Sequence, residues 1–319
     1  MANEAKLTSP TRAINESPLD LNLRKRHRII EQVIQAFLFA SGVISIFTTI
    51  GIVVYLGREA LLFFASPEAD LLEFLTGTKW QPHLGIFGIL PLLNATLMTT
   101  TIAMLVALPL GLCVAIFLSE YASDRIRGLV KPILEIIAGI PTVVLGFFAI
   151  YTMTPFLRGL LGKDVVQIYN TASAGIVMGI LILPLISSMV EDALSAVPRS
   201  LREGAFAVGA TRFEVATQIV VPAALSGISA AIILGISRAI GEAMIVAIAA
   251  GAGPNLTWNP FQPAETMTGH IVRISSGDLS YASIDYNSLF AIALMLFFIT
   301  LFLNLLSQRI ITRFREVYE

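Results

Sequence analysis

The sequence predicts an all-α membrane protein with six transmembrane helices. Of its 319 residues, 55% are hydrophobic and 13% are charged, and the mean hydropathy is +0.79, which is too apolar for an ordinary soluble domain. A helix needs about 20 consecutive, mostly apolar residues to cross the hydrocarbon core of a bilayer. Stretches of this kind predict spans at about residues 33–57, 95–118, 134–157, 168–190, 223–250 and 287–308. The predicted membrane domain as a whole covers residues 29–319.

Residues 1–28 precede the first predicted span and form a polar, cytoplasmic tail that ends in the basic cluster Arg24 to Arg28. Such a cluster could bind nucleic acid or acidic lipid, but its place just before a span favours a determinant of membrane topology. We therefore expect contact with membrane lipid and no nucleic-acid partner. No short apolar segment with a small-residue cleavage site precedes Val33, so we expect no cleaved signal peptide.

Prolines shape the second and third predicted spans. The apolar stretch at residues 84–119 is too long for one span and too short for two, and Pro91 and Pro109 interrupt it. Because proline removes a backbone hydrogen bond, we predict a short surface helix followed by the span itself. In the third span, Pro141 is expected to break the helix near its midpoint and to free carbonyl groups that the Thr142 hydroxyl can bind. An ordinary packing kink is the alternative for Pro141.

The basic residues predict the orientation, because cytoplasmic loops carry an excess of Lys and Arg. With the N-terminus inside, only five of the 21 basic residues face outward, and these are Arg58, Lys79, Arg158, Lys163 and Arg273. Arg238 lies in the membrane, and the other fifteen lie in the cytoplasm. Both termini are therefore predicted to be cytoplasmic.

The segment between the fourth and fifth spans, residues 191–222, is ordered by its sequence and is called the coupling segment below. Ser200–Glu203 and Thr211–Glu214 are both capping boxes, in which a hydroxyl and a carboxylate bind each other's backbone amides. They predict one helix from Leu201 and a second helix toward Ile219, with Gly209 as a left-handed stop between them. Pro222 is expected to open the fifth span.

The coupling segment resembles a motif of a known family. The residues that match are Glu203, Gly204, Ala205, Gly209, Ile219 and Pro222. Their spacing resembles the EAA loop of the permease subunits of ABC importers, with Gly204 in place of the first Ala. The resemblance implies the MetI-like fold of type I importer permeases in a bacterial inner membrane, and docking of this loop on an ATPase subunit dimer. A passive connector between two spans is the alternative.

The sequence contains no motor of its own. A Walker A loop needs a Lys after a Gly-rich turn to bind nucleotide phosphates, and none of the five lysines lies in such a pattern. The resemblance implies that ATP and Mg are bound by the partner ATPase and that this chain carries no cofactor. His27, His83 and His270 form no metal-protease or other catalytic motif, so we expect a transport subunit rather than an enzyme.

The fifth span carries charge inside the membrane. Small residues recur every four positions from Gly227 to Ala247, which predicts a helix at the centre of the bundle or at a subunit interface. Arg238 and Glu242 are four residues apart, so on a continuous helix they lie on one face. Such a pair could offer a guanidinium to a tetrahedral oxyanion. A structural ion pair is the alternative, and the residues themselves leave both open.

Two further segments, Ser237–Ala243 and Gly139–Gly146, resemble the phosphate permeases, and Trp80–Pro82 with Phe87–Pro91 resembles the layout of their PstC type rather than their PstA type. Asn94–Leu97 departs from the Gly-Thr-Leu step expected there. The resemblance implies import of inorganic phosphate, with Arg238, Glu242, Pro141 and Thr142 in the translocation pathway. It also implies a second, homologous permease of the PstA type and an extracytoplasmic phosphate-binding protein as partners.

Two other functions remain as alternatives at this stage. Permeases for sulfate, molybdate or phosphonate share the architecture and the loop. An ion-coupled secondary transporter is the alternative from another class, since buried Arg and Glu residues are common in such proteins. That alternative gives no reason for the two capped helices of the coupling segment.

Overall fold

The computed structural model describes residues 21–277 and 283–314 of the chain. The regular structure in these residues is helical, except for one short two-stranded hairpin. The chain divides into two units, Met1–Tyr55 and Leu56–Glu319, and each is described by itself.

The first helix, α1 (Leu21–Phe64), provides all the described structure of the first unit and continues into the second. Its portion Ile30–Phe64 is long and apolar enough to cross a membrane, in agreement with the first predicted span. Residues 21–28 of the predicted tail are therefore helical. The remainder of that prediction lies outside the described residues.

A small folded region precedes the second span. It consists of α2 (Leu71–Thr76), β1 (Trp80–Gln81), the 3-10 turn η1 (Pro82–Leu84) and β2 (Ile86–Phe87), with Trp80 paired to Phe87 in antiparallel register. The next helix, α3 (Leu90–Ile116), continues through a π-helical turn, η2 (Phe117–Tyr121). The predicted separate surface helix is thus wrong. Pro91 lies at the start of α3, where a missing N–H costs no helical hydrogen bond.

The third predicted span is broken at Pro141, as expected. It is divided among α4 (Asp124–Ala138), α5 (Thr142–Phe148), the π-helical turn η3 (Ala149–Met153) and α6 (Thr154–Leu161). The part that is long and apolar enough to cross a membrane is Thr142–Leu161, later in the chain than the predicted 134–157. The reason is that α4 carries several charged residues and buries none of its side chains within this chain.

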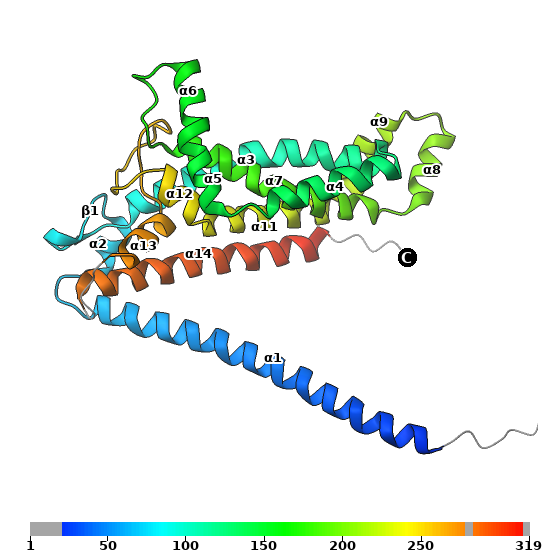
Figure 1. Cartoon of the computed structure of the whole chain (residues 1–319), viewed down its shortest axis with the longest axis horizontal. Helices are drawn as coiled ribbons and strands as arrows, with labels where there is room; N and C mark the ends of the chain where they lie inside the picture. Colours follow the sequence, from blue (N-terminus) through cyan, green and yellow to red (C-terminus); the bar gives the residue numbers. More distant parts are fainter. Residues whose placement is uncertain (1–20, 278–282, 315–319) are drawn as a thin grey trace, which may run out of the picture. The chain divides into compact units, whose positions relative to one another are not determined.

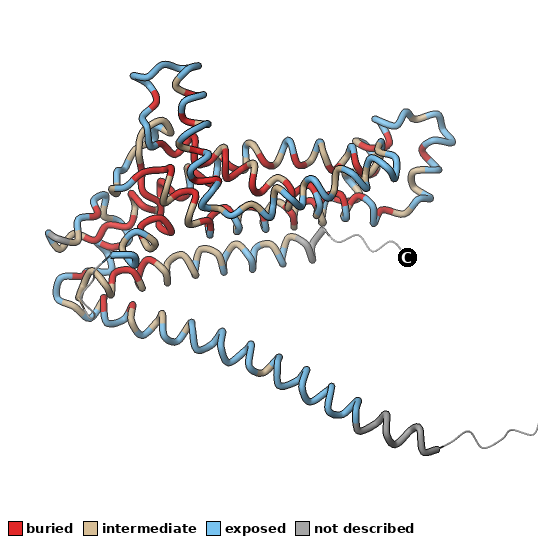
Figure 2. Tube along the Cα trace, viewed as in Figure 1, coloured by how far each residue is buried: buried red, intermediate tan, exposed pale blue. Residues whose placement is uncertain are grey.

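The fourth span, α7 (Thr171–Ser195), is the central helix of the second unit. In its most apolar window, 67% of the residues are buried, compared with 33% for α3 and 17% for the last helix. Close packing with α3 depends on two glycines. A Cβ atom at Gly175 would lie 2.8 Å from Ile102, and one at Gly179 would lie 2.7 Å from the carbonyl oxygen of Ala103. Figure 2 shows the buried residues concentrated where these helices run together.

Residues 191–195 of the coupling segment are the end of α7, and the rest folds into α8 (Arg199–Ala207), α9 (Arg212–Val215), a π-helical turn, η4 (Ala216–Val220), and α10 (Val221–Ala223). The fifth span follows as α11 (Leu225–Gly241) and α12 (Met244–Ala249), and the chain ends with α13 (Met267–Ser275) and α14 (Ile284–Phe314). Figure 1 shows α8 and α9 at one end of the bundle and β1, α2 and α13 at the other. We call these the coupling end and the opposite end.

Five helices in the described residues are long and apolar enough to cross a membrane, and the number is six if one bent pair is counted as a single span. That pair consists of Arg212–Ala223 and Leu225–Gly241, which meet at 73°. The fifth predicted span, 223–250, is therefore not one straight helix. It is bent at Ala224 and interrupted again after Gly241.

Candidate functional site

The first helix of the coupling segment begins earlier than predicted. Its N-cap is Pro198, with φ −55° and ψ 138°, and no side chain caps its amides. The predicted capping box at Ser200–Glu203 is therefore wrong, because Ser200 lies inside the first turn instead of before it. Proline fixes φ at a value compatible with this helix entry, so Pro198 sets the start two residues before Leu201.

The turn between the two short helices forms as predicted. Gly209 has φ +90°, its N–H donates to the Phe206 carbonyl at 3.0 Å, and the Ala210 N–H donates to the Ala205 carbonyl at 3.1 Å. This pair of bonds is a Schellman motif, which needs a left-handed residue and therefore favours glycine.

The second capping box is also confirmed. The Thr211 N–H donates to Oε2 of Glu214 at 2.7 Å, and the Glu214 N–H donates to the Thr211 hydroxyl at 3.4 Å. The helix that it begins runs through η4 and α10 to Ala223. Pro222 thus lies just before the 73° bend rather than at the start of the straight span. Only Ala224 separates this helix from α11.

The predicted coupling residues divide into an outward group and a supporting group. Glu203 and Gly204 are exposed, and the space around Gly204 is open. Ala205 is buried, and Ile219 packs against the core of the bundle. The outer face of the segment can therefore meet a partner while its inner face holds it to the spans.

Three exposed apolar residues of the coupling segment were not singled out from the sequence. Phe206, Val208 and Phe213 flank the turn and are 44%, 85% and 68% exposed. Large apolar side chains on a surface outside the apolar spans are typical of a protein-binding site. Their position on both sides of Gly209 was the available signal.

A buried carboxylate fastens α4 to α7 near the coupling end. Glu191 of α7 is 2% exposed and forms ion pairs with Arg127, at 3.3 Å, and with Lys131. Lys131 also lies 3.7 Å from Asp192. The hydrogen bond to Glu191 raises the pKa of Lys131 above its ordinary value, although burial opposes the shift. The polar face of α4 is therefore directed at α7.

Arg238 lines a pocket of about 270 Å³ between α4, α7 and α11, most of whose other walls are apolar. Its other polar neighbours there are Lys131, Glu135 and Ser188. Arg238 and Ser188 provide donors for an oxyanion, whereas Lys131 already pairs with Glu191 and Glu135 brings a carboxylate to the lining. Arg238 itself is exposed in the isolated chain.

The predicted pairing of Arg238 with Glu242 is wrong. No ion pair joins these two described residues, because α11 ends at Gly241 and Glu242 adopts an extended conformation with φ −70° and ψ 130°. Oε1 of Glu242 accepts a hydrogen bond from the Met244 N–H at 3.2 Å, and its carbonyl accepts one from the Thr268 hydroxyl at 2.7 Å. Glu242 is 8% exposed and fastens the broken helix to α13.

Pro141 and Thr142 mark the hinge between α4 and α5. Pro141 is the N-cap of α5, with φ −57° and ψ 132°, so the predicted break is confirmed. The Thr142 hydroxyl donates no hydrogen bond within the described residues, and the prediction that it binds freed carbonyls is therefore wrong.

The stripe of small residues predicted in the fifth span packs inside the second unit. A Cβ atom at Gly227 would lie 2.4 Å from the Ala193 Cβ, and one at Gly235 would lie 3.0 Å from Ile186. Both neighbours belong to α7. The prediction of a central position is confirmed for this part of the stripe.

The opposite end contains a second cluster of buried charge, which the sequence did not reveal. Glu265, 2% exposed, accepts hydrogen bonds from Arg273 at 2.6 and 2.8 Å and from the Gly253 N–H at 3.0 Å. His270 lies 3.2 Å from the same carboxylate, and its ring meets that of Trp80 at 5.4 Å, edge to face. Within the described residues, no group of three or more His, Cys, Asp or Glu side chains could hold a metal ion.

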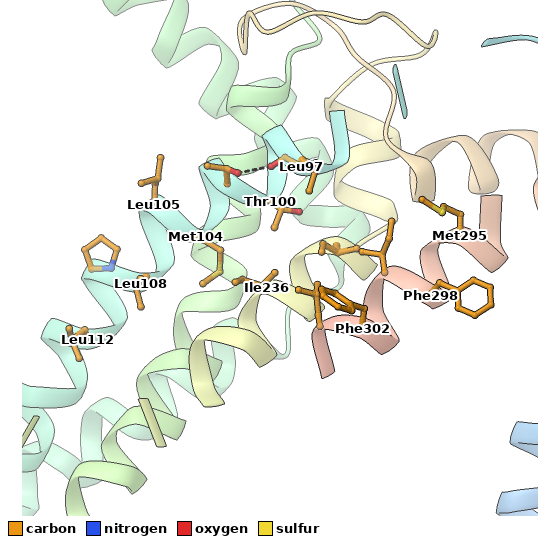
Figure 3. A pocket seen from close by; sticks show the side chains of 15 residues that line it. Leu97, Thr100, Met104, Leu105, Leu108, Leu112, Ile236, Met295, Phe298 and Phe302 are labelled. Carbon is orange, nitrogen blue, oxygen red and sulfur yellow. Dashed lines mark hydrogen bonds between the residues drawn. The ribbon is translucent and has the colours of Figure 1, made fainter. Parts of the chain in front are cut away.

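A larger cavity, of about 950 Å³, lies between α3, α11 and α14. Figure 3 shows that its walls are apolar side chains such as Leu108, Ile236 and Phe302. It has no charged lining residue and only the hydroxyls of Thr100 and Thr101 as polar groups, so it offers no cation to an oxyanion. The chemistry favours the smaller pocket at Arg238.

The apolar helical bundle and the exposed short helices of the coupling segment are typical of a membrane permease subunit. Residues 107–316 match the family described as binding-protein-dependent transport system inner membrane component. The chain belongs to this family of permease subunits.

Individual relatives cover most of the chain. It is 34% identical to the probable ABC transporter permease protein YqgH of Bacillus subtilis over 87% of this chain and 89% of that one. It is 30% identical to the phosphate transport system permease protein PstC of Mesorhizobium japonicum, over 82% and 86%. It is also 30% identical to the probable phosphate transport system permease protein PstC of Methanocaldococcus jannaschii, over 74% and 79%.

Solved structures share the fold. A chain of the MetNI methionine ABC transporter in an inward-facing conformation matches with a TM-score of 0.52 and 20% identity, over 72% of this chain and 95% of that one. A chain of a bacterial ABC transporter involved in alginate import matches with a TM-score of 0.51 and 18% identity, over 88% and 99%. The predicted MetI-like fold of a type I importer permease is confirmed.

Proposed function

We propose that this chain is the membrane-spanning permease subunit of an ATP-driven importer of inorganic phosphate. The observation that carries the proposal is its 30% identity, over most of both chains, to relatives named as phosphate transport system permease proteins. The guanidinium of Arg238, which lines a pocket between α4, α7 and α11, supports an anionic cargo. The permease binds no ATP or Mg in this proposal, because both belong to a separate ATPase dimer.

The coupling segment is the docking surface for that ATPase. Glu203, Gly204 and the turn at Gly209 face outward, and the apolar side chains of Phe206 and Phe213 flank them. The open surface at Gly204 lets a partner's backbone approach closely. Ala205, Ile219 and Pro222 support this surface from the bundle side.

The mechanical link from the docking surface to the pathway is short. The helix that begins at Arg212 joins α11 through Ala224 alone, and α11 carries Arg238. A displacement of the coupling segment therefore reaches Arg238 through one bend. An Arg near the middle of a bilayer costs about 3 kcal/mol on insertion scales, so the exposed face that carries it must meet water or another subunit.

We further propose the partner proteins of the subunit, its pathway residues and its orientation in the membrane. A second permease of the PstA type covers the face that carries Arg238, and Glu242, Pro141 and Thr142 lie along the pathway at breaks in the helices. An extracytoplasmic phosphate-binding protein delivers the cargo at the opposite end. Both termini lie in the cytoplasm of a bacterial cell, because that orientation places most Lys and Arg residues inside.

Reconstitution tests the proposal directly. The chain is incorporated into liposomes with its ATPase, second permease and binding protein, and uptake of labelled phosphate and labelled sulfate is measured with and without ATP. We expect phosphate uptake that requires ATP, and a strong loss of uptake in Arg238→Gln with little change in Arg125→Gln, an exposed arginine of α4. Uptake of sulfate alone would refute the cargo, and uptake of phosphate without ATP would refute the class of transporter.

A further inference from the structure

Arg202 belongs to the coupling segment, but its side chain points back into the bundle. Its side chain is 16% exposed, although it lies on α8 beside the exposed Glu203. Its guanidinium Nη1 donates to the Val197 carbonyl at 2.6 Å, and Nη2 donates to the Leu194 carbonyl at 2.7 Å. Leu194 lies in the last turn of α7, where carbonyls lack some of their helical partners, and Val197 follows the end of α7 by two residues.

The same guanidinium binds a carboxylate from another span. Nε and Nη2 of Arg202 donate to Oε1 of Glu120 at 3.3 and 3.1 Å. Glu120 lies in the π-helical turn that ends α3, its side chain is 9% exposed, and the Ser119 hydroxyl donates to the same oxygen at 3.0 Å. This contact joins residues that are 82 positions apart.

One side chain thus connects three elements: α8, the end of α7 and the end of α3. The bonds to Glu120 are charge-assisted, and low solvent exposure strengthens them. The planar guanidinium holds several acceptors in fixed directions, which the single ammonium group of a lysine cannot do. The three elements therefore cannot move independently while these bonds are kept.

We infer that Arg202 is a positioning residue that transmits displacement of the coupling segment to α3 and α7 together. This inference rests on the proposed function, since it assumes that an ATPase moves α8. It adds a second route to the direct connection through Ala224 to α11. Through both routes, the same displacement of α8 and α9 moves three spans at once.

The test uses the complete complex in liposomes and measures phosphate uptake and ATP hydrolysis in the same preparation. Arg202→Met keeps an unbranched side chain but removes every donor, and Glu120→Gln removes the charge of the partner. We expect uptake per ATP hydrolysed to fall about tenfold in both variants, the scale of losing a hydrogen bond to a charged group, while ATP hydrolysis changes less than about twofold. Arg125→Met, which changes an exposed arginine at the start of α4, is the matched control and should keep the wild-type ratio.

The outcomes separate the inference from the proposed function. A wild-type complex that fails to take up phosphate with ATP refutes the proposed function. A working wild type with an unchanged ratio in Arg202→Met refutes the inference, as does a parallel loss of uptake and ATP hydrolysis in a fully assembled complex, because both outcomes leave the uptake per ATP unchanged. If Arg202→Met does not assemble, Arg202→Lys and Glu120→Gln decide, because both keep a polar side chain at the contact. Wild-type ratios in these two variants overturn the inference, and reduced ratios in intact complexes support it.

Discussion

The two ends of the bundle hold their buried charges in different ways. At the opposite end, Glu265 binds Arg273, only eight residues along the chain, with His270 between them in sequence. At the coupling end, the contact of Arg202 with Glu120 spans 82 residues. The first arrangement fixes the shape of one loop. The second ties separate helices, so a shift of one helix is passed to the others.

Under the proposed function, this difference suits different roles for the two ends. A local cluster can stay rigid while the spans around it move, which suits a surface that receives a binding protein. Pairs between distant segments change whenever the helices shift against each other, which suits the end that receives force. Four changes test this contrast, beginning with the one expected to have the largest effect.

Gly227→Leu should damage the coupling end most. A Cβ atom at Gly227 would lie 2.4 Å from the Ala193 Cβ, so leucine must push the start of α11 away from the end of α7. Overpacking of this kind costs about 1–3 kcal/mol and sometimes more. Because leucine is a better helix former than glycine, helix propensity cannot cause the loss. We expect a clear fall in the melting temperature of the purified chain.

Gly128→Leu is the matched control for this change. Gly128 lies in α4, and a Cβ atom there meets no other atom within 4 Å. The control should therefore melt at or above the wild-type temperature. Equal melting temperatures for the two variants would contradict the close packing of α11 on α7.

Gly209→Val should separate ATP hydrolysis from transport without unfolding the chain. The positive φ of +90° at Gly209 costs a residue with a Cβ about 1–2 kcal/mol, and a β-branched residue is strained further. We expect uptake per ATP to fall severalfold, whereas Gly209→Asn should keep most of it because asparagine tolerates this conformation. At the opposite end, Glu265→Gln should leave the ratio unchanged. Normal coupling in Gly209→Val would refute the docking role of the turn.

Acid should destabilise the opposite end, and base should destabilise the coupling end. Burial raises the pKa of Glu265, but hydrogen bonds and charge from His270 and Arg273 outweigh it, so the pKa lies below its ordinary value of 4.5. Glu265 therefore stabilises the fold above that value, and this contribution is lost as the pH falls through the lowered pKa. The hydrogen bond from Lys131 to Glu191 raises the pKa of Lys131 above 10.5. Its contribution is present below that value and is lost as the pH rises through the raised pKa.

Melting temperatures measured across pH resolve these two contributions. The difference between wild type and Glu265→Gln should shrink below about pH 4.5, and the difference between wild type and Lys131→Met should shrink above about pH 10.5. A Glu265→Gln difference that persists in strong acid would show that hydrogen bonding, rather than charge, holds the opposite end.

Two features of the coupling segment could be predicted from neighbouring residues alone. The cap at Thr211–Glu214 and the stop at Gly209 were predicted correctly, because each depends on residues within a few positions of itself. The cap at Ser200–Glu203 was not, because Pro198 begins the helix first. Likewise Pro91 begins a helix that it was expected to interrupt. The first error comes from a proline that competes with the cap, and the second from the position of the proline, since proline is tolerated in the first turn of a helix.

Features that depend on distant contacts could not be predicted in this way. Arg238 and Glu242 were placed on one face on the assumption of a continuous helix, but the helix breaks after Gly241, where the Thr268 hydroxyl of α13 donates to the Glu242 carbonyl. The contact of Arg202 with Glu120 has no local signature in the sequence. The fold class and the number of spans needed only hydropathy, whereas these contacts needed the tertiary structure.

Trp80→Phe should have the smallest effect, and it sharpens the account of the opposite end. Trp80 is 2% exposed and packs edge to face against Phe87 at 5.7 Å and His270 at 5.4 Å, but its Nε1–H has no acceptor among the described residues. Phenylalanine keeps the aromatic contacts and removes a buried donor whose desolvation costs about 1–3 kcal/mol, which offsets the lost apolar area. We expect a change in stability of less than about 1 kcal/mol, and none in Trp258→Phe, where the replaced ring is 81% exposed. A loss as large as that of Gly227→Leu would mean that the Trp80 ring, rather than the charges around Glu265, holds the opposite end together.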